Sequence, residues 1–197
     1  MKKLKVNEIF YSLQGEGYHT GQAAIFVRFS GCNLKCPFCD TDFRDYTEMT
    51  EGELIDKIRE YPAKFVVFTG GEPTFQVTKG LCKMLHSLGY YLAIETNGMM
   101  PTVFDMDWVT LSPKNLYVKG ADPLIVQANE LKIVMDDKVD PELFKYPNIK
   151  VDYKYIQPCD TGDKERNQKI LQRCVDFIKE NPDWTLSLQT QKILNIK

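Results

Sequence analysis

The sequence has no long hydrophobic run, no block of like charge and only two histidines. No stretch approaches the roughly 20 apolar residues of a membrane-spanning helix, and the basic N-terminus turns polar before any signal-peptide core. The 25 lysines and arginines are scattered among 27 acidic residues, which argues against a surface that coats nucleic acid. We therefore predict a cytoplasmic protein that binds neither membrane nor nucleic acid.

Cysteine is also scarce, with six residues in 197, and the reducing cytoplasm disfavours structural disulfides. The cysteines are therefore expected to be core residues, metal ligands or redox groups. The chain length and a hydrophobic content of 43% suit a single domain that spans residues 1–197. No repeat or linker divides the sequence.

Seven short apolar runs, rich in β-branched and aromatic residues, indicate strands buried on both faces, as in a parallel sheet. They cover residues 23–30, 64–70, 90–98, 107–114, 130–135, 151–158 and 184–192. Helices are predicted over residues 51–60, 78–88 and 163–181, and residues 113–129 show no regular pattern. Thr50 and Glu53 have the spacing of a capping box at the start of the first helix.

Strands that alternate with helices predict an α/β fold, either an open doubly wound sheet or a βα barrel. A complete eight-unit barrel typically needs roughly 250 residues, which is more than this chain has. We therefore predict a partial (reduced) TIM-like barrel of about six parallel strands. Polar and glycine-rich clusters directly follow most of the runs, so we expect the active site at the C-terminal rim of the strands.

Three cysteines lie together in "SGCNLKCPFCD", where Cys32, Cys36 and Cys39 have the spacing C-x3-C-x2-C. A structural zinc site normally closes with a fourth cysteine or histidine, and none stands nearby in the sequence. A redox-active pair in "CPFC" leaves Cys32 without a role. Spacing alone therefore leaves open an iron-sulfur cluster, a zinc site, and a redox or packing role. Three thiolates on a four-iron cluster would leave one iron for an outside ligand.

The cysteine spacing resembles the signature of the radical S-adenosylmethionine (SAM) superfamily. The stretch "TGGEPT", which follows the second predicted strand, resembles the Gly-Gly-Glu motif of the same enzymes. The resemblance implies a 4Fe-4S cluster held by the three cysteines and SAM chelated to the open iron. Reductive cleavage of SAM would then give a 5'-deoxyadenosyl radical, so the cofactors carry the chemistry.

Further stretches resemble one family within it, 7-carboxy-7-deazaguanine synthase. They extend from Leu13 to the C-terminus and are "YSLQGEG", "FVRFSGCNLKCPFCDT", "TGGEPT", "ETNG", "LSPK", "YIQP" and "LSLQTQK". The resemblance implies a homodimeric lyase of queuosine and deazapurine biosynthesis. Its substrate would be 6-carboxy-5,6,7,8-tetrahydropterin, which loses a hydrogen at C6, contracts its ring and releases ammonia to give 7-carboxy-7-deazaguanine. Mg²⁺ would assist, and an electron donor such as flavodoxin or ferredoxin would reduce the cluster.

The resemblance also assigns residues, with Thr41 as the Mg²⁺ ligand and no side chain as catalytic acid or base. The implied cofactor contacts are Phe38, Gly70, Gly71, Glu72, Glu95, Asn97, Ser112, Lys114 and Gln157. The implied substrate contacts are Leu13, Gln14, Gly15, Glu16, Arg28, Thr74 and Gln191. Taken without the resemblance, Arg28 suits a substrate carboxylate or a structural ion pair equally well, and Phe38 could cover the adenine or shield the cluster.

Two positions depart from the family pattern. Gln191 stands where members commonly carry histidine, so a neutral amide replaces a charged group and should weaken the contact with the substrate carboxylate. The sequence ends in "NIK" where a final proline is common, which leaves any role of the terminal carboxylate open.

Two rival interpretations are a glycyl-radical-enzyme activase, which "LQGEG" and the C-terminal stretch disfavour, and a non-catalytic zinc-binding module.

Overall fold

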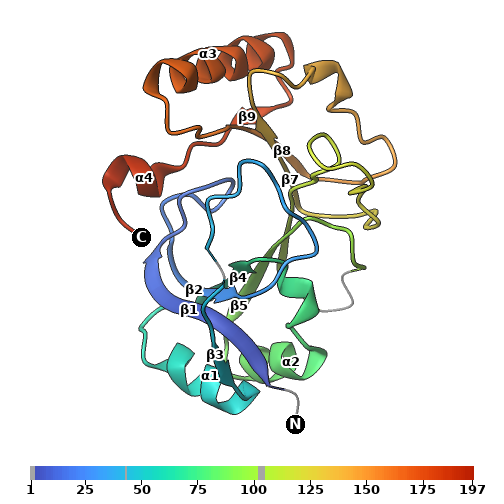
Figure 1. Cartoon of the computed structure of the whole chain (residues 1–197). Coiled ribbons are helices and arrows are strands. Elements are labelled where there is room, and N and C mark those ends of the chain that lie inside the picture. Colours follow the sequence, from blue (N-terminus) through green and yellow to red (C-terminus); the bar gives the residue numbers. More distant parts are fainter. Residues whose placement is uncertain (1–2, 43, 102–104) are drawn as a thin grey trace.

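The computed structural model describes residues 3–42, 44–101 and 105–197 (Figure 1). Its strands are β1 (Leu4–Leu13), β2 (Ala23–Phe29), β3 (Thr47–Met49), β4 (Phe65–Gly70), β5 (Tyr91–Thr96), β6 (Trp108–Leu111), β7 (Glu130–Met135), β8 (Tyr153–Pro158) and β9 (Thr185–Leu186). Its helices are α1 (Glu51–Arg59), α2 (Lys79–Ser87), α3 (Lys164–Glu180) and α4 (Thr190–Leu194), with 3₁₀ turns η1 (Pro73–Phe75) and η2 (Pro141–Leu143). Within these ranges, no helix has both the length and the apolar character that a membrane crossing needs.

The described strands form one sheet in the order β3-β1-β2-β4-β5-β6-β7-β8-β9. Each neighbouring pair from β2 to β9 is parallel, whereas β1 runs antiparallel to both β2 and β3. Six of the parallel strands have four residues or more, and β9 has two, so the predicted strand number is confirmed. In the part of the chain that the structure describes, β3 and β9 are edges that no strand joins, so the sheet does not close.

β1 lies outside the predicted runs because its residues alternate and do not form a continuous apolar stretch. In "LKVNEIFYSL", Leu4 and Val6 are buried and Lys5 between them is exposed, which is the pattern of a strand covered on one face. A register shift between Val6 and Glu8 interrupts its pairing with β2. β1 leads into the loop of residues 14–22, which contributes to the cavity described below.

The predicted strand over residues 184–192 is wrong beyond Leu186. Only Thr185 and Leu186 pair with β8, and the chain then turns into α4. The amide and the hydroxyl of Thr190 both donate to the carbonyl oxygen of Gly15, at 3.1 and 2.9 Å. These hydrogen bonds attach the segment to the distant loop of residues 14–17, and a local hydrophobic pattern does not encode such a contact. Figure 1 shows α4 near the blue strand β1.

The three long predicted helices are confirmed as α1, α2 and α3. The hydroxyl of Thr50 accepts the Glu53 amide at 3.2 Å while the Glu53 carboxylate accepts the Thr50 amide at 2.7 Å, which completes the predicted capping box. At the starts of α2 and α3, the side chains of Thr78 and Asp163 accept the Leu81 and Arg166 amides. As predicted, residues 113–129 contain no described helix or strand apart from an isolated bridge at position 127.

The two faces of the sheet have different chemistry because side chains alternate along each strand. One face packs on α1 and α2 through residues such as Phe68 and Ile94, which are fully buried, and on α3 through Ile133. Burying each such side chain contributes about 1.5–3 kcal/mol. The residues between them point to the other face, where β7 places Glu130 and Lys132. The parallel strands therefore present an interior with charged groups, which is where the cavity lies.

Candidate active site

A cavity of about 780 Å³ is lined by the C-terminal parts of the parallel strands, the cysteine loop, the loop after β1 and the C-terminal segment. Every residue predicted for the site lines this cavity except Gly15 and Thr74. Thr74 instead donates its hydroxyl to Glu72 at 2.6 Å. Gly15 packs against Gln191, whose side-chain oxygen would lie 1.7 Å from a Cβ at that position. The motifs from both ends of the chain thus converge on one cavity.

The two glycines of "TGGEPT" fit the β4 loop against the cysteine loop. A Cβ at Gly71 would lie 1.9 Å from the Gly31 carbonyl oxygen, and one at Gly70, where φ is +123°, would lie 2.3 Å from the Phe29 oxygen. The Glu72 amide donates to the Gly31 oxygen at 2.8 Å, and the Gly71 amide donates to the Phe29 oxygen at 3.0 Å. The close approach that excludes a side chain here is therefore to protein backbone.

The Glu72 carboxylate is buried and joins the loops that follow β4 and β5. Its Oε1 accepts the hydroxyls of Thr74 and Thr96, at 2.6 and 2.7 Å, and its Oε2 accepts the Asn97 amide at 2.9 Å. A carboxylate has about four lone-pair sites, so Oε2 keeps acceptor capacity on the cavity side. Asn97 continues the link, because its Nδ2 donates to Asn33 of the cysteine loop at 2.8 Å.

Cys32, Cys36 and Cys39 are free thiols that line the same cavity. In residues 3–42, 44–101 and 105–197, no three His, Cys, Asp or Glu side chains converge as ligands of one metal ion. In a four-iron cluster each thiolate binds a different iron, so three separate thiols on one cavity fit that group. Burial raises the pKa of Cys32 and Cys36, and at Cys36 the Lys114 ammonium opposes this effect.

The other predicted cofactor contacts lie at the ends of β6 and β8 and, in the case of Phe38, in the cysteine loop. Lys114 donates to the carbonyl oxygen and the hydroxyl of Ser112, at 2.7 and 2.6 Å, and burial lowers its pKa to about 8. Gln157 is buried and its Oε1 accepts the Ser187 hydroxyl at 3.0 Å. Phe38 lines the cavity and packs edge-to-face on Tyr117, with ring centroids 4.6 Å apart. These contacts hold the side chains in place before any ligand binds.

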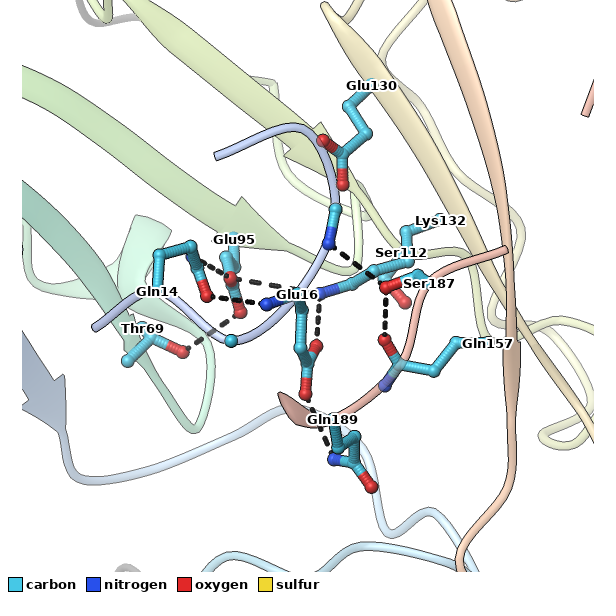
Figure 2. Close-up of polar contacts among 12 residues, drawn as sticks. Gln14, Glu16, Thr69, Glu95, Ser112, Glu130, Lys132, Gln157, Ser187 and Gln189 are labelled. Carbon is cyan, nitrogen blue, oxygen red and sulfur yellow. Dashed lines mark hydrogen bonds and ion pairs between the residues drawn. The ribbon is translucent and has the colours of Figure 1, made fainter. Parts of the chain in front are cut away.

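Gln14 and Glu16, two of the predicted substrate contacts, belong to a polar network that also includes Glu95 (Figure 2). Gln14 Nε2 donates to Glu95 Oε1 at 3.1 Å, and the Glu16 amide donates back to Gln14 Oε1 at 3.2 Å. The Glu16 carboxylate accepts Lys132 on Oε2 at 2.5 Å and Gln189 on Oε1 at 3.0 Å. Glu95, which the resemblance assigned to the cofactor, therefore shares its contacts with the loop after β1.

Comparison with known proteins places this site in a family. The Radical SAM superfamily model matches residues 26–114. A 7-carboxy-7-deazaguanine synthase from Bacteroides thetaiotaomicron is 44% identical over 193 residues, which cover 98% of this chain and 98% of the relative. The chain belongs to the 7-carboxy-7-deazaguanine synthase family.

Two further relatives of the 7-carboxy-7-deazaguanine synthase family agree. The synthase from Burkholderia multivorans is 40% identical and the match covers 97% of this chain and 98% of that relative. The crystal structure of QueE from Escherichia coli has a TM-score of 0.77 and 28% identity, covering 94% of this chain and 93% of that chain. This likeness confirms the predicted radical SAM partial barrel.

Arg28 occupies a position that the 7-carboxy-7-deazaguanine synthase resemblance assigned to the substrate, and it has protein partners. Its Nε lies 3.2 Å from Glu8 Oε1, and its Nη1 donates to the Thr41 hydroxyl at 3.3 Å. Lys197 also contacts the Glu8 carboxylate, through its Nζ at 2.5 Å. The structural ion pair is thus present, and Arg28 still lines the cavity.

Gln191, the departure from the family pattern, donates its Nε2 to Glu16 Oε1 at 3.2 Å. Its own Oε1 is buried and has no hydrogen-bond partner among the residues that the structure describes. A buried amide oxygen left unpaired costs about 1–3 kcal/mol. The neutral side chain therefore supports Glu16 with one hydrogen bond and leaves one polar atom unsatisfied.

Four residues of this family member's site escaped the sequence analysis, namely Lys132, Glu130, Ser187 and Gln189. Glu130 and Lys132 alternate with Leu131 and Ile133 in "ELKIVM", and this period of two signals a strand with one polar face. No sequence pattern indicates a site role for Ser187, because its contacts with the Gly17 amide and Gln157 depend on the tertiary path of the chain.

Proposed function

We propose that this chain is a radical SAM lyase that converts 6-carboxy-5,6,7,8-tetrahydropterin to 7-carboxy-7-deazaguanine with loss of ammonia. Family membership supports the reaction, since identity to a named synthase is 44% along nearly the whole chain. The observation that carries the proposal is the single cavity that the three motif cysteines share with the loop after β1. Its volume of about 780 Å³ is in the range of small-molecule sites.

Cys32, Cys36 and Cys39 are the proposed ligands of the cluster, and Glu72, Asn97, Ser112, Lys114 and Gln157 the proposed contacts of SAM. Bound together, cluster and SAM supply the one-electron chemistry that removes a hydrogen atom from the substrate. The protein's part is to bind, to orient and to exclude water. Fixed contacts such as those of Glu72 with Thr96 and Asn97 suit that part, because preorganised groups need no rearrangement on binding.

The substrate is proposed to lie between the Gln14–Glu16 loop and Arg28. Glu16 accepts hydrogen bonds and Gln14 both donates and accepts, which matches the amino and amide edge of a pterin ring. The Arg28 guanidinium, oriented by Glu8, is the proposed partner of the substrate carboxylate. Gly15 and Thr74, which do not line the cavity, are proposed to act through the residues they contact.

Thr41 is proposed to give one oxygen to Mg²⁺, with substrate and water oxygens completing the octahedron. Thr41 lines the cavity, and among the described residues its hydroxyl accepts one long hydrogen bond of 3.3 Å, from Arg28. The ion would have to displace that contact. Omitting Mg²⁺ from the assay below should therefore lower turnover of wild-type protein more than that of a Thr41→Val variant.

We further propose that the chain acts as one domain and assembles as a homodimer. One sheet contains every described strand, which supports the single domain. A low-potential carrier such as flavodoxin or ferredoxin is the proposed electron donor. All six cysteines are free thiols, which suits the reducing environment of the cytoplasm.

Anaerobic turnover tests the reaction. Protein with a reconstituted cluster is given a reductant, SAM, Mg²⁺ and 6-carboxytetrahydropterin, and mass spectrometry follows 7-carboxy-7-deazaguanine and 5'-deoxyadenosine. Formation of the deazaguanine is the expected result. Accumulation of 5'-deoxyadenosine without it would refute the substrate while leaving the cofactor assignment intact. A Cys36→Ser variant, which should form neither product, is the matched control.

A further inference from the structure

A buried lysine lies between two carboxylates of the cavity. Lys132 is in the middle of β7, only 4% exposed, and lines the cavity. Its Nζ is 2.5 Å from Glu16 Oε2 and 3.8 Å from Glu95 Oε1 (Figure 2). Burying an ammonium group is costly unless it is paired with good geometry. The two glutamates come from the loop after β1 and from β5, so one side chain connects three separate parts of the chain.

Both carboxylates keep acceptor capacity for a ligand. Glu16 accepts Lys132 on Oε2, and Gln189 and Gln191 on Oε1. Glu95 accepts Gln14 on Oε1, and among the described residues its Oε2 has one contact, of 3.5 Å, with a threonine hydroxyl. With about four lone-pair sites each, both groups retain unfilled positions, and both line the cavity. An ionised carboxylate is an acceptor only, so the part of the cavity wall that Glu16 and Glu95 form is suited to N–H donors.

The charges around Lys132 explain why the ionised state of the Glu16 carboxylate depends on this lysine. Glu16, Glu95 and Glu130 all raise the pKa of Lys132 against the effect of burial, and Lys114 is the nearby cation. Burial alone would raise the pKa of Glu16, but the Lys132 ammonium and the hydrogen bonds from Gln189 and Gln191 together outweigh burial and hold that pKa well below its usual value. Without the ammonium, like charge and burial would both favour protonation of Glu16.

We propose that Lys132 is a positioning residue of the substrate site: its buried ammonium group holds the Glu16 and Glu95 carboxylates together as acceptors for adjacent N–H groups of a heterocycle. The inference rests on the proposed function, in which the amino-pyrimidinone edge of the pterin supplies those N–H groups. It assigns Lys132 no contact with the reacting carbon. A purely structural ion pair would lower the stability of the protein and leave KM for the pterin unchanged.

The test compares Lys132→Met and Lys132→Arg with Lys154→Met, a matched control on the adjacent strand β8 whose ammonium pairs with Asp183. Cluster-loaded proteins are assayed anaerobically with the pterin from pH 6 to 9. We expect kcat/KM of Lys132→Met to fall roughly 100-fold at pH 6, mainly through KM, and to recover as pH rises and Glu16 ionises. Lys132→Arg should regain most of the activity, and Lys154→Met should match wild type.

Thermal unfolding supplies a second readout that does not need the substrate. In Lys132→Met the unpaired carboxylates become charged as pH rises, so the Tm deficit relative to wild type should widen from pH 5 to pH 8. A pH-independent deficit, or a kcat/KM loss that is equal at pH 6 and pH 9, would overturn the proposal. If wild type itself forms no deazaguanine, the proposed function fails, and the Tm comparison still decides whether Lys132 controls these carboxylates.

Discussion

Replacing Gly71 with alanine tests whether the cysteine loop depends on its packing against the β4 loop. The new Cβ would lie 1.9 Å from the Gly31 carbonyl oxygen, where ordinary contacts begin near 3.4 Å, so the two loops must separate by roughly 1.5 Å. That movement breaks the 2.8 Å hydrogen bond from the Glu72 amide to Gly31 and the 3.0 Å hydrogen bond from the Gly71 amide to Phe29. It also withdraws the loop that carries the cysteines from the loop that carries Glu72.

The expected cost combines two effects. Overpacking costs about 1–3 kcal/mol, and each of the two broken backbone hydrogen bonds contributes about 0.5–1.5 kcal/mol. The sum of about 2–6 kcal/mol corresponds to a Tm decrease of about 4–24 °C for a chain of this length. Because the thiols move with the loop, Gly71→Ala should also bind less iron and sulfide after reconstitution.

Two other glycines separate this clash from the general effect of losing a glycine. A Cβ added at Gly52 in α1 would meet, among the described non-neighbouring residues, the Thr50 hydroxyl at 3.9 Å, so Gly52→Ala should leave the Tm unchanged or raise it slightly. Gly21 has φ of +88°, and a Cβ added there would meet no described non-neighbouring residue within 4 Å, so Gly21→Ala should cost only the backbone strain of about 1–2 kcal/mol. Differential scanning calorimetry and iron and sulfide analysis measure the three variants. A Gly71→Ala protein with wild-type Tm and full iron content would refute the packing argument.

Three further predictions concern single side chains. Glu72→Gln puts an amide N–H against a hydroxyl or the Asn97 amide. Chemical denaturation should therefore show that the free energy of unfolding falls by about 1–3 kcal/mol. A stability equal to that of wild type would contradict the assignment of Glu72 as a buried acceptor. A hydrogen bond from Lys192 is the main cause that lowers the pKa of Asp160 to about 2, so the stabilisation by Asp160 is present above pH 4 and lost as pH falls toward 2. In Asp160→Asn, the free energy of unfolding should therefore depend less on pH in that range. The same pH dependence as in wild type would contradict this prediction. Gln191→His should lower KM for the pterin most at pH 6, where imidazole is charged, and a KM that is independent of pH would contradict the charge argument.

Most of the parallel sheet could be predicted because its strands are continuous apolar runs, and α1 to α3 because their caps are local. Thr50 and Glu53 are three residues apart, so the capping box is visible in the sequence alone. The antiparallel strand β1 was missed because one of its faces is polar. The end of the chain was misassigned because Thr190 is held by Gly15, and no local pattern reports a partner so far away.

The site residues also fall into those that the sequence predicts and those that it does not. Residues that follow a strand directly, such as Cys32, Glu72 and Lys114, could be placed at one rim because parallel strands end together. Lys132 lies within a strand, where a charged residue in an apolar run is easily taken for a surface position. Its burial becomes visible only once the strand's inward face and its partner Glu16 are located.

The contacts between the loop of residues 14–17 and residues 187–191 also have a consequence for biosynthesis. The Gly17 amide and the Ser187 hydroxyl are 170 positions apart, and Gly15 and Thr190 are 175 apart. At a synthesis rate of roughly 5–20 residues per second, about 10–30 s pass between translation of the first partner and of the second. During that interval Glu16, and Lys132 once it has been translated, have no C-terminal segment beside them. The interior of the nascent chain therefore remains open to water, and the site is completed only after residues 187–191 have been translated.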